Sequence, residues 1–226
     1  TFIFSNPNNP SGVVYSQEEI TKIAELVREY DVNVIVGELY SRQLFDDRTY
    51  THLASLDIVP EEKIVTIIGP SKTESLSGFR LGVAYGSKAI IDRMEQLQAI
   101  VSLRAGGYSQ IVLKNWFSEP EGWMAERIRA HQDIRDTLLT LFRNAGFEVR
   151  TTEAGSYIFP KIRDLSIDCE NFVKVLKKQA KVTVTPGTQF GPQFTDCIRL
   201  NFSQDKEKAV DAVERIIKVA GYYKNE

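Results

Sequence analysis

The sequence predicts an α/β fold, with a mostly parallel sheet in the first part of the chain and a smaller α+β domain after it. Nearly continuous apolar runs, such as VNVIVG (32–37) and KIVTIIG (63–69), are separated by helical or loop segments. This pattern is typical of parallel strands that are covered on both faces. From about residue 147, short strand patterns alternate with helical ones, which indicates a second core. We therefore expect domains at 1–130 and 131–226, divided within a helix.

The expected elements of the first domain follow from local signals. Ser16 followed by Glu19 is a capping box, which predicts that a helix begins there. NPNNPSG (6–12) is rich in turn formers and predicts a tight loop. The expected strands are 1–5, 32–39, 64–69 and 80–86. The loop between the last two is too short for a helical crossover, which allows an antiparallel pair there.

The remaining elements are expected from periodicity. A helix should begin at Lys88, and a long helical stretch should run from about 109 to 144, with an interruption near 119–123 and a stop at Gly146. The strands expected beyond it are 147–152, 156–162, 181–187 and 197–203, interleaved with helices near 168–180 and 205–220. This order is an α+β layout.

The composition excludes several classes of protein. The 226 residues are 42% hydrophobic and 26% charged with a net charge of −2, so the chain lacks the basic footprint of a nucleic-acid binder. The longest apolar runs are too short to cross a bilayer. Two cysteines and two histidines argue against a disulfide framework, a metal cluster and a histidine-dependent triad. We therefore expect no nucleic-acid, membrane or metal partner.

The sharpest functional signal is GPSKTESLSGFRLG (69–82). Lys72 directly follows a hydrophobic strand and is surrounded by small residues, which is a poor place for a solvated charge. Desolvation lowers the pKa of a lysine, and the free amine can then form a Schiff base with an aldehyde cofactor. Arg80 suits a phosphate, and Ser71 offers a further donor. A flexible serine-rich loop is the alternative interpretation, and a P-loop is excluded because its motif is absent.

Three weaker signals accompany this loop. Asn9 lies in the turn-forming segment, and Tyr40 ends a buried strand, where α/β sheets present ligand-binding groups. Arg199 lies within CIRLNFS (197–203), an otherwise apolar strand, and its planar fork could hold a carboxylate. Each also has a plain structural interpretation: a simple turn for Asn9, packing for Tyr40 and solvent exposure for Arg199.

In this order and spacing, these residues resemble the fold-type-I, class I/II pyridoxal-phosphate-dependent aminotransferases over nearly the whole chain. The resemblance implies that Lys72 forms the internal aldimine with pyridoxal 5'-phosphate and then shuttles the α-proton of the substrate. Arg80, in K-x(7)-R, matches the arginine that grips the cofactor phosphate, and Ser71 matches the serine before the lysine.

The same resemblance assigns the other three residues. Asn9 and Tyr40 match the groups that donate to the phenolic oxygen of the cofactor, and Asn9 also faces the substrate. Arg199 matches the arginine that binds the substrate α-carboxylate. The implied reaction moves an amino group between an α-amino acid and a 2-oxo acid in a cytoplasmic homodimer. Arg104 and Tyr108 fall where the family reaches into the site of the partner subunit; an ordinary turn is the alternative there.

The sequence departs from the family at one chemically important position. The family pattern D-x-x-Y has an aspartate that keeps the pyridine nitrogen protonated, and here that position is Gly37. Glu38 is adjacent, but side chains alternate along a strand, so it should point the other way. Gly69 replaces a common phosphate-binding Ser or Thr. Two alternatives therefore stay open: a lyase or oxidase that tolerates Gly37, and a non-catalytic paralogue.

The resemblance also implies a large domain that is incomplete at its N-terminus, because the chain begins with TFIFSNP in mid-strand. The upstream part of the family carries the helix that cradles the phosphate and the aromatic residue that stacks on the ring. The identity of the substrate side chain cannot be read from this sequence.

Overall fold

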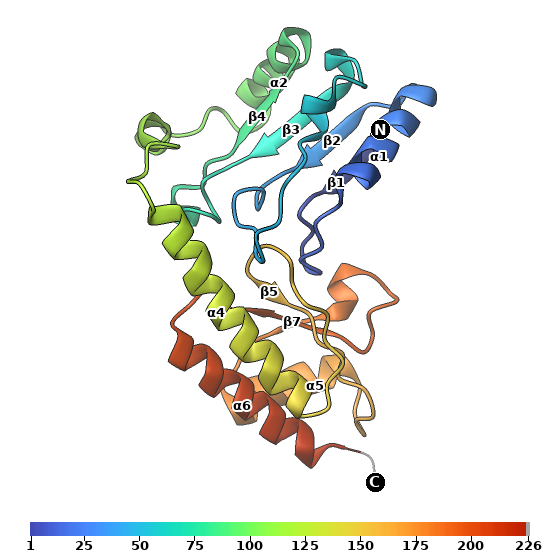
Figure 1. Ribbon diagram of the computed structural model, residues 1–226, viewed down its shortest axis with the longest axis vertical. Coiled ribbons are helices and arrows are strands. Elements are labelled where there is room, and N and C mark those ends of the chain that lie inside the picture. Colours follow the sequence, from blue (N-terminus) through green and yellow to red (C-terminus); the bar gives the residue numbers. More distant parts are fainter. Residues whose placement is uncertain (225–226) are drawn as a thin grey trace. The chain divides into compact units, whose positions relative to one another are not determined.

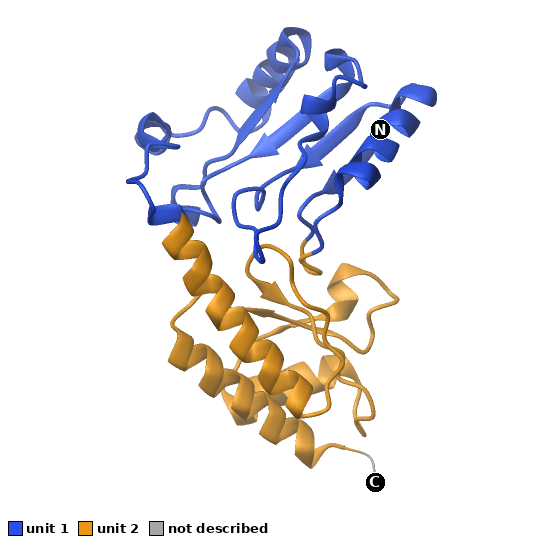
Figure 2. Ribbon diagram, in the orientation of Figure 1, with its two compact units in different colours: residues 1–8, 13–124 blue, residues 9–12, 125–226 orange. Residues whose placement is uncertain are grey.

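The computed structural model describes residues 1–224 (Figure 1). Their contacts form two compact units (Figure 2). The first comprises residues 1–8 and 13–124, and the second comprises residues 9–12 and the chain from Ala125 onward. The loop predicted at 6–12 therefore divides between the units. The predicted domain boundary at 130/131 stays a prediction.

The first unit contains a four-stranded sheet in the order β1-β2-β3-β4. Its strands are β1 (Phe2–Ser5), β2 (Val34–Gly37), β3 (Ile64–Ile68) and β4 (Val83–Gly86). The first three strands are parallel and β4 is antiparallel to β3, so the predicted mostly parallel sheet and its antiparallel edge are confirmed. Gly37 pairs with Ser5 on one side and Ile67 on the other. The carboxyl ends of β1, β2 and β3 thus lie at one edge.

Helix α1 (Gln17–Glu29) begins at the predicted capping box. The backbone N–H of Glu19 donates to Ser16 Oγ at 3.2 Å, and the N–H of Ser16 donates to Glu19 Oε2 at 2.7 Å. The apolar face of α1 is buried with side chains of β2 and β3 and of the following loops. This core consists of Ile20, Ala24, Val27, Val34, Leu53, Val59 and Ile64.

The rest of the first unit is helical but less regular than the sequence predicts. Helix α2 (Lys88–Val101) is followed by only short turns, α3 (Gly107–Gln110) and a 3₁₀ segment (Ile111–Asn115). The stretch predicted from about 109 is therefore not a regular α-helix before its interruption, whereas the interruption predicted near 119–123 is confirmed, since the long helix begins at Trp123. Phe117 and Gly122 have positive φ values of 68° and 79°, which a helix does not allow. Shorter 3₁₀ segments span Leu53–Leu56, Glu61–Lys63 and Ser77–Phe79.

The second unit combines three helices with a small sheet. The helices are α4 (Trp123–Asn144), most of which belongs to this unit, α5 (Cys169–Val175) with a π-helical extension (Leu176–Ala180), and α6 (Lys206–Tyr222). The strands are β5 (Tyr157–Ile158), β6 (Thr185–Pro186) and β7 (Ile198–Asn201), antiparallel in the order β5-β7-β6. A 3₁₀ turn (Gly187–Phe190) follows β6. No described helix is long and apolar enough to span a membrane.

The strand predicted at 147–152 is wrong. Only Glu148 forms an isolated bridge, to Lys161, within that segment. The carbonyl of Thr152 instead accepts a hydrogen bond of 2.7 Å from Arg135 of α4, whose side chain is 2% exposed. The next residues donate their backbone N–H groups to the carbonyl of Gly12. These backbone groups therefore find partners outside a sheet.

The two faces of the small sheet differ in polarity. Ile158, Ile198 and Leu200 lie on the face that is buried in the core of the unit. Because side chains alternate along a strand, Arg199 lies on the opposite face. Its register partner across β6 is Thr185. The fold thus fixes an arginine on the face that the core does not cover.

Candidate active site

Lys72 lies half-buried in the turn that follows β3. The turn is closed by a hydrogen bond of 3.1 Å from the N–H of Leu76 to the carbonyl of Pro70. Ser71 Oγ donates to the carbonyl of Leu81 at 3.3 Å, which ties the start of the loop to its end. The lysine is therefore held by a hydrogen-bonded turn rather than a structureless serine-rich segment.

Arg80 ends the same loop and is exposed. Its backbone is left-handed, with φ at 52°. Its Nη1 donates to the carbonyl of Ser77 at 2.8 Å, so the guanidinium folds back on its own loop. The structure brings Ser71, Lys72 and Arg80 into one loop, and the phosphate-binding role of Arg80 stays a prediction.

Tyr40 is 4% exposed and lies in the turn after β2, where its carbonyl accepts the N–H of Gln43 at 2.9 Å. Gly37 of β2 is aligned with Ile67 of β3, and these two strands are parallel. Tyr40 and Lys72 therefore follow neighbouring strands at the same edge of the sheet. Edges of this kind are where α/β sheets bind ligands.

The position of the missing aspartate has room for a side chain. A Cβ built on Gly37 would find Ser5 Cβ at 3.8 Å and the Phe4 carbonyl at 3.9 Å as its nearest neighbours, which is ordinary van der Waals contact. Glu38 does not substitute for the aspartate. Its buried carboxylate is hydrogen-bonded through Oε2 to His52 Nδ1 at 2.5 Å. That hydrogen bond raises the pKa of His52 despite the opposing effect of burial.

Arg42 links three segments of the first unit, and sequence reasoning missed it. Its Nη1 donates to Glu74 Oε1 at 2.5 Å and to Glu119 Oε1 at 2.9 Å, and its Cζ lies 4.5 Å from the centre of the Phe117 ring. Arg42 comes two residues after Tyr40, and Glu74 comes two residues after Lys72. The pair therefore ties the tyrosine turn to the lysine turn. The only sequence signal for this ion pair is that Arg42 and Glu74 each lie two residues after a candidate site residue.

The second unit brings Asn9 and Arg199 together, although 190 positions separate them in the chain. Arg199 Nη1 donates to Asn9 Oδ1 at 3.2 Å, and Nη2 donates to Thr185 Oγ1 at 3.2 Å. The rings of Tyr157 and Phe190 lie 4.4 Å and 4.6 Å from its Cζ. Arg199 is thus held in place and half-buried, and its three other neighbours were not predicted.

Comparison with known proteins decides the family. The family model described as aminotransferase class I and II matches residues 1–216, which is nearly the whole chain. The chain belongs to the class I and II aminotransferases. It is 30% identical over 219 residues to an aspartate aminotransferase of Pyrococcus abyssi, covering 96% of this chain and 56% of that protein.

Two solved structures share the fold of this aminotransferase chain. An aspartate aminotransferase from Rhodobacter sphaeroides 2.4.1 superposes with a TM-score of 0.96 at 57% identity and covers 99% of this chain. An aromatic aminotransferase from Pyrococcus horikoshii OT3 superposes with a TM-score of 0.90 at 29% identity and covers 97%. This chain covers 57% and 59% of those two structures. The chain therefore spans a little over half the length of the relatives it matches.

The class I and II aminotransferases depend on pyridoxal 5'-phosphate, and the chemistry of the residues in the first unit fits that group. The lysine loop offers the amine, a hydroxyl and a guanidinium, which suit an aldehyde and a phosphate. Tyr40 offers a buried phenol at the same sheet edge. The missing element is the carboxylate at Gly37, whose backbone leaves space for one.

Proposed function

We propose that this chain is part of a pyridoxal-phosphate-dependent aminotransferase that moves an amino group between an α-amino acid and a 2-oxo acid. The observation that carries the proposal is Lys72, held half-buried in a closed turn at the carboxyl edge of a parallel sheet. The family match and the names of the relatives, which are aspartate and aromatic aminotransferases, support it. The substrate side chain is not specified by this chain.

The residues of the first unit have separable roles in this proposal. The cofactor supplies the electron sink for the reaction. Lys72 would hold the cofactor and would move the proton at the substrate Cα. Tyr40 would donate a hydrogen bond to the ring oxygen, and Ser71 and Arg80 would bind the phosphate. The Arg42–Glu74 pair keeps the turns of Tyr40 and Lys72 at a constant separation.

Asn9 and Arg199 hold the substrate in this proposal. A guanidinium binds a carboxylate through two parallel hydrogen bonds. The amide of Asn9 accepts one N–H of Arg199 and can donate its own N–H groups to the substrate or to the ring oxygen of the cofactor. Arg199 therefore orients the α-carboxylate, and Asn9 fixes the orientation of Arg199.

Gly37 favours a second candidate function. Without a carboxylate at this position, the pyridine nitrogen is less readily protonated, and carbanion stabilisation is weaker. A lyase or oxidase that needs less stabilisation, or a non-catalytic paralogue, accounts for Gly37 without further change. The carboxylate of Glu38 does not remove this difficulty, because it is buried against His52.

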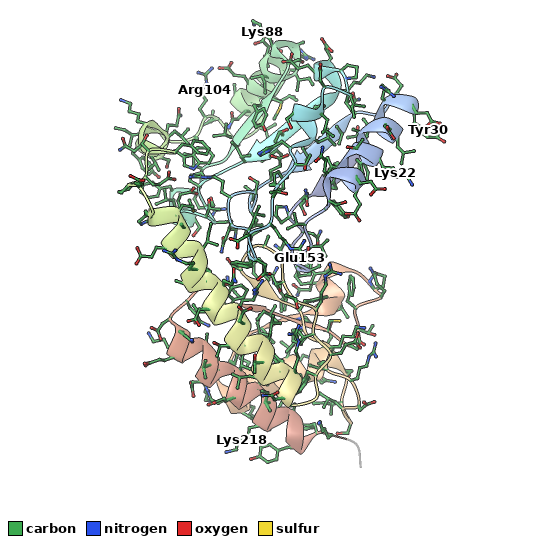
Figure 3. The ribbon with its side chains drawn as sticks, in the orientation of Figure 1. Lys22, Tyr30, Lys88, Arg104, Glu153 and Lys218 are labelled. Atoms are coloured by element: carbon green, nitrogen blue, oxygen red, sulfur yellow. The ribbon has the colours of Figure 1, made fainter. Side chains whose placement is uncertain are left out.

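We further propose a cytoplasmic homodimer in which the first unit is the C-terminal part of a cofactor-binding large domain and the second is the small domain. The coverage of the relatives supports the domain assignment. Exposed apolar side chains on and after α2 support dimerisation: Leu97, Ile100, Val101, Leu103 and Tyr108. Among them Arg104 extends outward (Figure 3) and pairs with Glu95 at 2.7 Å, so this polar contact can face a partner subunit.

The test is spectroscopic and chemical, on the complete gene product. The lysine-bound cofactor should give a visible absorbance band that Lys72→Ala abolishes. Amino-donor screening with detection of the 2-oxo acid should then show transamination, whereas a lyase releases ammonia without consuming an oxo-acid acceptor. A complete protein that binds no cofactor, or a band that survives Lys72→Ala, would refute the proposal.

A further inference from the structure

The guanidinium of Arg199 is enclosed in a way that its predicted role does not require. Its Cζ lies 4.4 Å from the ring centre of Tyr157 and 4.6 Å from that of Phe190. We propose that Tyr157 and Phe190 are positioning residues that hold the guanidinium plane, so that Arg199 presents its edge to the substrate carboxylate. This inference rests on the proposed role of Arg199 in binding the substrate α-carboxylate.

The backbone fixes where the guanidinium begins. Arg199 is in register with Thr185 of β6, and Thr185 Oγ1 accepts one of its N–H groups at 3.2 Å. Its neighbours along β7, Ile198 and Leu200, are 0% and 6% exposed on the opposite face. The strand cannot rotate without exposing those two side chains to water. Arg199 must therefore stay on the face that carries Tyr157.

The hydrogen-bond donors of Arg199 lie along the edge of its guanidinium. An arginine has five N–H donors, all in the guanidinium plane. Asn9 and Thr185 accept two of them, and the structure shows no partner for the other three within the described residues. Aromatic rings that stack on the guanidinium favour ligands that approach in its plane. A carboxylate matches this approach with two parallel hydrogen bonds.

Phe190 is itself held in place, as a positioning residue must be. It ends the short turn that begins at Gly187, and the N–H of Gly187 donates to the carbonyl of Cys197 at 2.7 Å. The edge of Phe159 packs against Phe190 with the ring centres 5.9 Å apart and the planes at 87°. Contacts with a guanidinium of this kind strengthen as water is excluded. Ordering Arg199 in advance lowers the entropy cost of binding substrate.

The kinetic test compares Phe190→Leu with a matched control in the complete, cofactor-loaded protein. Phe190→Leu should raise KM for both the amino acid and the 2-oxo acid by about tenfold and change kcat by less than about twofold, given the strength of a partly buried cation–π contact. Phe194→Leu removes a ring of similar exposure that packs on Phe159 and leaves both rings that contact Arg199, so its KM should be unchanged. Phe190→Tyr keeps an aromatic ring at this position, so its KM should equal that of the original protein.

Inhibitor binding tests the same contact without turnover. A carboxylate inhibitor should bind about tenfold more weakly to Phe190→Leu and with unchanged affinity to Phe194→Leu. Equal weakening in the two variants, or an unchanged inhibition constant and KM in Phe190→Leu, would overturn the proposal. A fall in kcat without a change in KM would also overturn it.

A third measurement does not depend on catalysis. Protons above an aromatic face are shifted upfield in NMR spectra, so the Nε–H resonance of Arg199, assigned by its loss in Arg199→Lys, should move downfield in Phe190→Leu. If the resonance does not move, the proposed positioning of Arg199 by the two rings is overturned, while the proposed reaction is unaffected. If the resonance moves but the protein transaminates no substrate, the positioning role is kept and the proposed function is refuted.

Discussion

Gly37→Asp should raise the rate of transamination. The family places at this position an aspartate that keeps the pyridine nitrogen of the cofactor protonated, and this chain has a glycine. The geometry accepts the change, because a Cβ at this position meets nothing closer than 3.8 Å. Gly37 also lies in a regular parallel register between Ser5 and Ile67, with no left-handed backbone to strain. The substitution therefore tests chemistry rather than folding.

The expected magnitude follows from the charge that Gly37→Asp introduces. An opposite charge at hydrogen-bond distance shifts a pKa by about 1 to 3 units, in this case raising the pKa of the pyridine nitrogen. Each unit corresponds to about 1.4 kcal/mol, or about tenfold in rate if it is fully expressed in the transition state. We therefore expect the single-turnover rate to rise by about 10-fold to 1,000-fold. Replacing a strand glycine also removes a conformational cost of about 0.5 to 1 kcal/mol.

The assay measures single-turnover transfer from an amino acid to the bound cofactor, with 2-oxo acid detection, in the complete protein. Gly37→Asn is the matched control, since it adds nearly the same volume without a negative charge and should leave the rate almost unchanged. An unchanged or lower rate in Gly37→Asp, in a protein that still folds and binds cofactor, would refute the reasoning. Equal gains in the Asp and Asn variants would show that filling the space, not the charge, is responsible.

Three further predictions concern contacts within the first unit or within the second. Arg42→Met should lower the free energy of unfolding by about 1 to 3 kcal/mol, because it removes the cation that pairs with the largely buried Glu74 and with Glu119. Glu74→Gln should cost less, because Arg42 keeps its pair with Glu119, and the double variant should lose less than the sum; urea titration measures these losses. Phe142→Ala should cost about 3 to 5 kcal/mol in the same assay, since Phe142 is fully buried in the second unit. The pKa of His52 is raised in the fold, so its contribution to stability is complete below its unfolded pKa of about 6.5 and is lost as pH rises through the folded pKa. His52→Asn should therefore flatten the fall in stability above pH 6.5, which unfolding at a series of pH values measures, and an unflattened profile would contradict it.

Sequence reasoning succeeded where the deciding interactions are local. The capping box of α1 lies within four residues, and the antiparallel β3–β4 pair follows from the length of one loop. It failed at 147–152, where the deciding partner is Arg135, a buried arginine supplied by a helix. The interruption predicted near 119–123 was confirmed, but the break begins earlier than predicted, after Asn115, where Phe117 has a positive φ value.

The candidate site divides along the same line. The lysine loop was predicted because its chemistry and its turn are contiguous in the chain. Arg199 was only a weak signal from its strand, and its substrate-binding role was implied by a resemblance; its neighbours Tyr157, Thr185 and Phe190 were not predicted at all. They come from three other segments, and only the pairing of β5 and β6 with β7 brings those segments together. No local pattern contains that information.

The two sides of β2 explain why the neighbouring glutamate cannot restore what Gly37 lacks. Val34, Val36 and Glu38 are all buried, whereas the intervening positions are only partly covered, so Glu38 continues the side opposite to Gly37. On its own side of the strand, Glu38 is hydrogen-bonded to His52 and raises the pKa of that histidine. Glu38→Gln should therefore lower the pKa of His52 while leaving intact the rate gained by Gly37→Asp, in NMR titration and single-turnover assays of the double variant. Loss of that gain in Glu38→Gln would show that the two carboxylates act on one centre, against the strand geometry.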